Sequence, residues 1–153
     1  MKKIFLFLFI IAAFSGNAQQ PAGSPADEEA IRTLIQTAYV EGLQNEGDTV
    51  KINRGFHPGF EMLMAGKGGT LEKYSIAEWK KRIRTSLAEG KLPRREGERI
   101  SVRFQDISVN GNAAVARFEF YAGTRLAFID YLMLYKYEEG WKIVGKIYAK
   151  IQN

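Results

Sequence analysis

The sequence predicts an α+β domain in which about three N-terminal helices pack on a strongly curved, mainly antiparallel sheet. Apolar residues recur at helical spacing in the first half of the chain and alternate at strand spacing in the second half. Glycine-containing turns separate the alternating segments, as in consecutive hairpins. A curved sheet with helices across its concave side would leave a pocket in the middle.

The N-terminus predicts export from the cytoplasm. Lys2 and Lys3 precede an unbroken apolar run at 4–14, and small residues at 16–18 suit cleavage before Gln19. The run is too short to span a bilayer as a helix, which needs about 20 residues. No cysteine follows it, so a lipid-modified N-terminus is excluded.

These signals divide the chain into a signal peptide at 1–18, a flexible leader at 19–26 and a single domain at 27–153. We therefore predict a periplasmic or extracellular protein with no stable membrane insertion after cleavage. The chain has no cysteine, so disulfides, thiol nucleophiles and cysteine metal sites are excluded. Its net charge of +5 is mildly basic and indicates no particular partner.

Two helices are predicted before the first strand. The segment 27–44 is amphipathic, and Asp27 is a suitable N-cap. A short second helix at 48–56 begins with Asp48 and is expected to stop at Pro58. The apolar positions of the first helix are Ala30, Ile31, Leu34, Ile35, Ala38 and Leu43.

A hairpin and a third helix follow. Short strands at 60–65 and 70–74 are joined by glycine-rich residues 66–69, which resemble a phosphate-binding loop only superficially because they connect two strands. Ser75 and Glu78 form the capping-box pattern that opens a helix at 75–89.

The remaining chain predicts four long strands joined by tight turns. The apolar phase slips near Gln105-Asp106, which indicates a bulge, and Asn110-Gly111 is a strong hairpin signal. The strands are expected at 98–109, 113–122, 125–137 and 141–151.

Four short motifs resemble one known family. They are Asp-Tyr-Leu-Met-Leu-Tyr-Lys at 130–136, Glu-Gly-Trp-Lys-Ile-Val at 139–144, Phe-His-Pro at 56–58 and Gly-Asp at 47–48. Together they resemble the putative lumazine-binding family of the nuclear-transport-factor-2-like (SnoaL-like) superfamily. The resemblance covers 27–151 and implies that superfamily's cone fold. It also implies a heterocyclic or steroid- or polyketide-like ligand.

The same superfamily contains ketosteroid isomerase and polyketide cyclases. By position, Tyr39 resembles the isomerase's helix tyrosine and Asp130 its strand acid, both oxyanion-hole donors. The isomerase's base position falls at or near Met64, which cannot take a proton. An isomerase, hydratase or cyclase that works without a metal remains an alternative to a binding protein without catalysis.

Asp130 also stands out from the residues alone. It interrupts an apolar row on its strand, and a buried acid must be hydrogen-bonded or costs several kcal/mol. It either contacts a ligand or is a structural acid paired with an arginine, a tyrosine or a backbone N–H. A buried Tyr39 would also need a partner, which either Asp130 or a ligand could supply.

His57 is the only histidine, so a zinc site built by protein ligands is not expected, and neither is a cofactor. Its helix-ending position favours a structural role, although general acid/base work is an alternative. The predicted ligand-binding residues are Tyr39, Met64, Trp79, Phe118, Phe128 and Asp130. With Phe56, Met62, Phe104 and Phe120, the apolar members could line a pocket or fill it.

Two surface features suggest other partners. Residues 80–95 are rich in lysine and arginine, which could bind an anionic surface or simply form a solvated helix face. Export argues against nucleic acid. The outer sheet face, with Tyr131, Met133, Tyr135 and Tyr137, could form a homodimer or dock a partner. The leading hypothesis is a small-molecule binder with no evident catalytic base.

Overall fold

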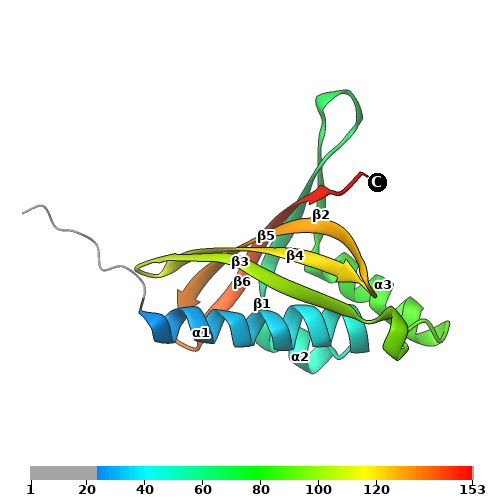
Figure 1. Ribbon diagram of the computed structural model, residues 1–153, viewed down its shortest axis with the longest axis horizontal. Coiled ribbons are helices and arrows are strands. Elements are labelled where there is room, and N and C mark those ends of the chain that lie inside the picture. The colour runs from blue at the N-terminus through cyan, green and yellow to red at the C-terminus, as the bar shows by residue number, and fades with distance from the viewer. Residues whose placement is uncertain (1–23, 153) are drawn as a thin grey trace, which may run out of the picture.

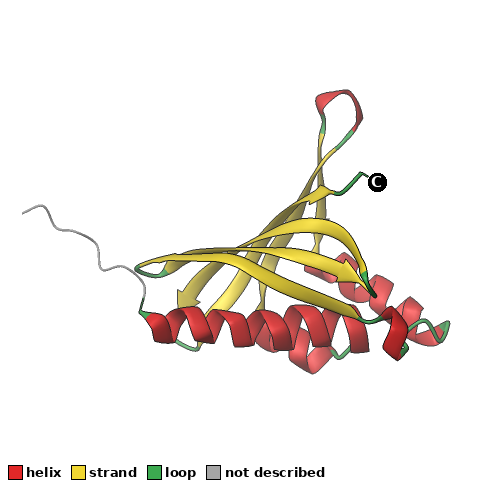
Figure 2. Cartoon of the chain, in the orientation of Figure 1, coloured by secondary structure: helices red, strands yellow, loops and turns green. Residues whose placement is uncertain are grey.

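The computed structural model describes residues 24–152. Its helices lie on one side of a curved six-stranded sheet (Figures 1 and 2). They are α1 (Pro25–Leu34), continued directly by the π-helical segment η1 (Ile35–Glu46), then α2 (Thr49–Gly55) and α3 (Ile76–Ala88). The predicted signal peptide at 1–18 lies outside the described residues, as does the predicted leader up to residue 23.

The sheet is mainly antiparallel, as predicted. Its order is β2-β1-β6-β5-β4-β3, and only the neighbours β1 and β6 run parallel. Two short 3₁₀ turns, η2 (Lys67–Gly69) and η3 (Glu96–Glu98), lie in the connections. The strands are β1 (Phe56–Ala65), β2 (Leu71–Ser75), β3 (Ile100–Asn110), β4 (Ala113–Ala122), β5 (Arg125–Tyr137) and β6 (Gly140–Lys150).

The first helix begins earlier than predicted. The Ser24 side chain caps it by accepting the N–H of Asp27 at 3.2 Å, and Pro25 suits the first turn because a proline needs no N–H partner there. The second half winds as a π-helix rather than the regular α-helix that the periodicity predicted, and it ends at Gly47 with φ 74°. The buried face of η1 includes Tyr39, whose phenol ring lies inside the domain.

Small residues let α2 lie directly against η1. A Cβ on Gly55 would sit 2.1 Å from the Cβ of Ala38, and one on Gly42 would sit 2.7 Å from that of Lys51. Asp48 caps α2 as predicted. The helix ends at Gly55, and Pro58 lies instead in β1, within a stretch where the pairing with β6 is interrupted.

The hairpin β1–β2 and the start of α3 follow the sequence signals. Gly66 N–H donates to the carbonyl of Thr70 at 2.8 Å, so the glycine-rich segment is a turn between strands. The Ser75–Glu78 capping box is confirmed in both directions. The hairpin tip projects beyond the rest of the sheet (Figure 1).

Bulges decide which side chains face the helices. The predicted bulge in β3 is confirmed between Phe104 and Asp106. A second interrupts β5, where Phe128 and Leu126 pair with consecutive residues of β4. A third interrupts β6 at Val144, and it reverses the facing of every later residue in that strand.

The core lies between the helices and the concave sheet face. Phe118, Leu132, Leu134 and Ile143 of the sheet are essentially inaccessible, as are Ile31 and Ile35 of the first helix. Within residues 24–152, no helix has the length and apolar character needed to cross a membrane.

Candidate functional site

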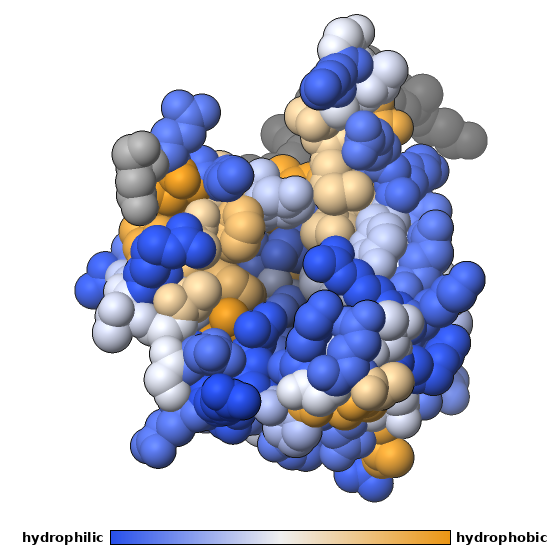
Figure 3. Space-filling model, turned by 90° about the vertical axis from the view of Figure 1, so that its right-hand side faces the viewer, coloured by the Kyte–Doolittle hydropathy of each residue, from blue (hydrophilic) through white to orange (hydrophobic). Residues whose placement is uncertain are grey.

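A pocket of about 550 Å³ opens between α3, the end of η1, the segment leading into β3 and the concave face of the sheet. These elements meet at the side of the molecule that Figure 3 turns toward the viewer, where the surface is hollowed near its centre. Aromatic and apolar side chains form much of the wall: Met62, Trp79, Ile83, Leu92, Phe120, Phe128 and Tyr148. The pocket lies beside the packed core.

Three buried polar side chains meet at the pocket wall. The Tyr39 hydroxyl donates to Asp130 Oδ2 at 2.6 Å. Lys146 Nζ donates to the same Oδ2 at 2.6 Å and to the Tyr39 oxygen at 2.5 Å. Tyr39 and Lys146 line the pocket, whereas Asp130 lies behind them with no exposed surface. Of the two partners considered for Tyr39, Asp130 or a ligand, the structure places Asp130 against its hydroxyl.

Four aromatic rings surround the Lys146 ammonium. Its Nζ lies 4.9 Å from the ring centroid of Tyr39, 5.3 Å from Tyr148, 5.8 Å from Phe120 and 5.9 Å from Trp79. Rings at such distances attract a cation through their negative faces. The Lys146 side chain is only 6% exposed, so little water solvates its positive charge. Asp130 and the aromatic rings stabilise that charge instead.

Burial shapes the acid–base properties of this cluster. Desolvation lowers the pKa of Lys146, and the negative charge of Asp130 opposes that shift. Burial, followed by the charge of Asp130, raises the pKa of Tyr39 well above its usual value. Tyr39 consequently keeps its proton at neutral pH and donates it to the carboxylate.

One polar atom of the cluster has no partner within residues 24–152. Asp130 Oδ1 is buried and accepts no hydrogen bond there, while Oδ2 accepts two. Buried acceptors in proteins are nearly always satisfied, often by water. Asp130 Oδ2 is thus the acceptor for both Tyr39 and Lys146.

The mouth of the pocket carries polar and charged side chains. Arg82 and Ser86 lie one turn apart on α3, while Lys91, Arg94 and Glu98 lie in the segment before β3. Arg82, Lys91 and Glu98 are exposed, whereas Ser86 and Arg94 are half-buried.

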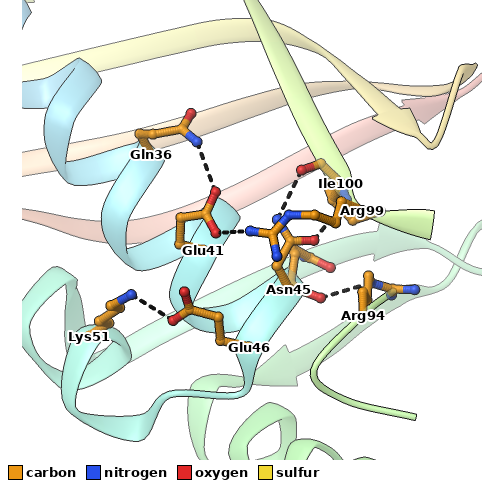
Figure 4. Close-up of polar contacts among 9 residues, drawn as sticks. Gln36, Glu41, Asn45, Glu46, Lys51, Arg94, Arg99 and Ile100 are labelled. Carbon is orange, nitrogen blue, oxygen red and sulfur yellow. Dashed lines mark hydrogen bonds and ion pairs between the residues drawn. The ribbon is translucent and has the colours of Figure 1, made fainter. Parts of the chain in front are cut away.

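Asn45, completely buried, fastens this segment to the first helix (Figure 4). Its side chain exchanges two hydrogen bonds with the backbone of Ile100, at 2.9 and 2.7 Å, as a neighbouring strand would. Its carbonyl accepts the N–H of Arg94 at 2.8 Å. An ion pair between Arg99 and Glu41 adds a further link. These contacts fix the segment before β3, which carries Arg94 and Glu98 at the mouth, to η1.

The predicted ligand-binding residues fall into two groups. Tyr39, Trp79 and Phe128 line the pocket. Asp130 lies behind the wall, Phe118 is fully buried in the core, and Met64 lies beyond Met62 toward the hairpin tip.

The remaining catalytic candidate, His57, also lies off the pocket. Its Nδ1 accepts the N–H of Gly59 at 3.0 Å, and its ring stacks on Tyr137 at 5.2 Å. No group of three or more His, Asp or Glu side chains that could hold a metal ion is found among residues 24–152.

Sequence reasoning missed Lys146. Alternation from Trp141 and Ile143 directs it to the outer face, because it follows them by an odd number of residues. The bulge at Val144 turns it inward. Gly145 is the available signal, since an isolated glycine within a strand often marks a bulge or a close approach of backbone.

Comparisons with known proteins agree with this architecture. The structure is similar to an NTF2-like protein of unknown function from Shewanella baltica, with 20% sequence identity and a TM-score of 0.64 over 86% of this chain and 99% of that chain. It is also similar to an NTF2-like protein of unknown function from Silicibacter pomeroyi, with 22% identity and a TM-score of 0.62 over 81% of this chain and 95% of that chain. A domain of unknown function with a cystatin-like fold from Nostoc punctiforme is similar as well, with 18% sequence identity and a TM-score of 0.59 over 86% of this chain and 81% of that chain.

At these identities the structural neighbours establish the fold, which is NTF2-like as predicted. A search of curated proteins found no match. The model of the family described as "Putative lumazine-binding" matches residues 26–149, nearly all of the described chain. The chain therefore belongs to the putative lumazine-binding family.

Proposed function

We propose that this protein is exported and binds a small, flat heterocyclic or polycyclic molecule in the pocket beneath α3. The observation that carries the proposal is the buried Lys146 at the wall of a 550 Å³ pocket. An ammonium group has three N–H donors, and Lys146 uses two of them on Tyr39 and Asp130. The third is available to a carbonyl or ring nitrogen of a ligand.

The rest of the wall suits the body of such a ligand. Trp79, Phe120, Phe128 and Tyr148 present aromatic surface, and ligand pockets typically combine such surface with a few oriented polar groups. The volume falls within the range of about 300–1,000 Å³ usual for small-molecule sites. The family description points to a lumazine-like heterocycle, which has both ring carbonyls and a flat aromatic face.

Binding without catalysis accounts for the cluster better than an isomerase-like reaction. The Tyr39 proton is engaged by Asp130, and Asp130 is ion-paired behind the wall. Neither is free to move a proton to or from a ligand. His57 lies elsewhere, and Glu98 is exposed at the mouth. The cluster is better suited to hold Lys146 in one position than to carry out proton transfer.

Native mass spectrometry of the protein purified from its own cell envelope tests the proposal. We expect extra mass of a few hundred daltons that leaves on unfolding, and a thermal shift with added lumazine. Ser86→Trp should abolish both, because an indole at this half-buried position would fill the mouth. Thr85→Trp is the matched control, because Thr85 is exposed and off the lining.

Equal ligand retention by Ser86→Trp and the wild type would contradict the site. Absence of any bound mass, together with no thermal shift, would contradict the function. Export is tested on the same sample, because we expect its N-terminal sequence to begin at Gln19. An intact Met1 in the envelope fraction would contradict cleavage.

A second candidate function is a homodimeric scaffold. Large apolar side chains are exposed on the outer face of the sheet: Val115, Met133, Tyr135 and Ile147 are 39–48% accessible. Contiguous apolar surface of this kind is typical of protein–protein contacts. The two candidates are compatible, because the pocket opens on the opposite side of the sheet from this face.

A further inference from the structure

Two arginines from separate elements line the mouth of the pocket. Arg82 lies on α3 and Arg94 on the segment before η3. On α3, the positions that line the pocket are Trp79, Arg82, Ile83 and Ser86, which form one helical face. Arg82 and Ser86, four residues apart, therefore form the polar side of this face, and Trp79 and Ile83, also four apart, form its apolar side.

Arg94 is held in place by two contacts, and its two terminal guanidinium nitrogens form no hydrogen bond within residues 24–152. Its backbone N–H donates to the carbonyl of Asn45 at 2.8 Å, and its Nε donates to the carbonyl of Gln44 at 2.8 Å. Asn45 is itself fixed to the sheet by the paired bonds to Ile100. The guanidinium is thus positioned before any ligand arrives, which reduces the entropic cost of binding.

The charges at the mouth are unequally compensated. Lys91 pairs with Glu89 at 2.6 Å, and Lys146 pairs with Asp130. Within the described part of the chain, neither Arg82 nor Arg94 forms an ion pair with an acid, and Glu98 is the one acidic residue of the lining. A planar guanidinium matches the two oxygens of a carboxylate or phosphate.

We infer that the ligand is an anion, with an aromatic body against the inner wall and a carboxylate or phosphate group held at the mouth by Arg82 and Arg94. This inference rests on the proposed function and adds the chemical class of the ligand. It also gives a role to the part of the basic run at 80–95 that faces the pocket. The other residues of that run remain a solvated surface.

A pair of probes with one ring system tests the inference. 2-Naphthoate carries a carboxylate, and 2-naphthamide is neutral and nearly the same shape. Titration calorimetry on the protein purified from its own cell envelope without denaturation should show naphthoate binding about 10-fold more tightly at low salt, as expected for charge-assisted hydrogen bonds. The preference should shrink as salt is added, because the mouth is exposed to solvent.

Matched variants distinguish binding by Arg82 and Arg94 from a general attraction of the anion to the positively charged surface. Arg82→Gln and Arg94→Gln should each weaken naphthoate binding about 5- to 10-fold and leave naphthamide unchanged. Arg84→Gln and Arg95→Gln remove the same charge from exposed neighbours that do not line the pocket, and should change neither affinity. Circular dichroism checks that all four variants remain folded.

The possible outcomes are distinct. Equal affinity for the two probes, or equal losses in the site and control variants, would overturn the inference and leave the proposed pocket standing. Binding of neither probe, with no ligand carried through native purification, would overturn the proposed function and this inference with it. Selective loss in Arg82→Gln and Arg94→Gln supports both.

Discussion

At the scale of single residues, the main feature is a lysine placed inside an NTF2-like domain. Removing an ammonium from water costs several kcal/mol, and Lys146 recovers this only through Asp130, Tyr39 and the surrounding rings. The three polar side chains therefore act as one unit. The removal of one member leaves the others buried without their partners.

A double-mutant cycle tests this coupling. Asp130→Asn and Lys146→Met should each lower the free energy of unfolding by about 3–5 kcal/mol, because each leaves a buried group uncompensated. The double variant should cost much less than the sum, because no charge then remains. Urea unfolding followed by circular dichroism measures all three values.

Lys150→Met is the control for the cycle, because Lys150 is exposed on the same strand and should change stability by no more than about 0.5 kcal/mol. Strictly additive losses would show that the residues do not act as a unit.

At the scale of elements, close contacts and a cap decide how the helices meet the sheet. Asp27 at the start of α1 accepts from Lys136 Nζ at 2.7 Å and from Trp141 Nε1 at 2.9 Å. These donors lie on β5 and β6, so one carboxylate joins the beginning of the first helix to the two central strands of the sheet. The same residue is therefore both part of the helix start and a tertiary contact.

This contact predicts a pH dependence. The hydrogen bond from Lys136, followed by those from Trp141 and Ser24, lowers the pKa of Asp27 from 3.8 to about 2. Because the folded pKa is the lower one, the stabilisation is complete above pH 3.8 and is lost as the pH falls toward 2. Wild type should thus exceed Asp27→Asn in stability at pH 5, and the difference should shrink by pH 2.5.

Chemical unfolding at the two pH values provides the measurement. A difference that stays constant between them would contradict the charge-dependent contact, because the asparagine does not titrate.

The contact of α2 with η1 predicts a strong effect of one methyl group. In Gly55→Ala the new Cβ would lie 2.1 Å from that of Ala38, so the helices must separate. Overpacking of this kind costs about 1–3 kcal/mol, measurable as a fall in the urea midpoint. Gly97→Ala is the control, because within residues 24–152 no atom other than those of its chain neighbours lies within 4 Å of its Cβ position. Equal midpoints for the two variants would contradict the close packing.

At the scale of the whole molecule, one layer of helices leaves one sheet face uncovered. The uncovered face carries Met133 and Tyr135, which are 39% and 48% exposed. A second copy of the chain would bury these side chains. The pocket, on the helical side, would stay open in such a dimer.

Analytical ultracentrifugation tests the dimer. We expect a concentration-dependent dimer for the wild type, weakened at least about 10-fold in Tyr135→Lys because a buried lysine at the contact would be unpaired. Leu71→Lys is the control, since Leu71 is 64% exposed but lies on β2 at the far edge of the sheet. A wild-type protein that stays monomeric at every concentration would remove this candidate.

The sequence alone determined the order of the elements, the α+β class, the capping box at Ser75 and the bulge near Gln105. These features depend on local signals: the period of apolar residues, capping side chains and glycine turns. It also indicated that Asp130 and Tyr39 would each need a polar partner if buried, because an unpaired buried polar group is costly; the structure showed that they pair with each other.

Only the tertiary structure decided which side chains meet at the pocket. The bulge at Val144 turned Lys146 from the outer face to the inner one, and a one-residue slip of this kind has only a weak local signal. Likewise, Arg94 lines the mouth because Asn45, distant in sequence, fastens its segment to the helix. Whether the cone is hollow depends on how all its side chains pack together, which no single segment of sequence specifies.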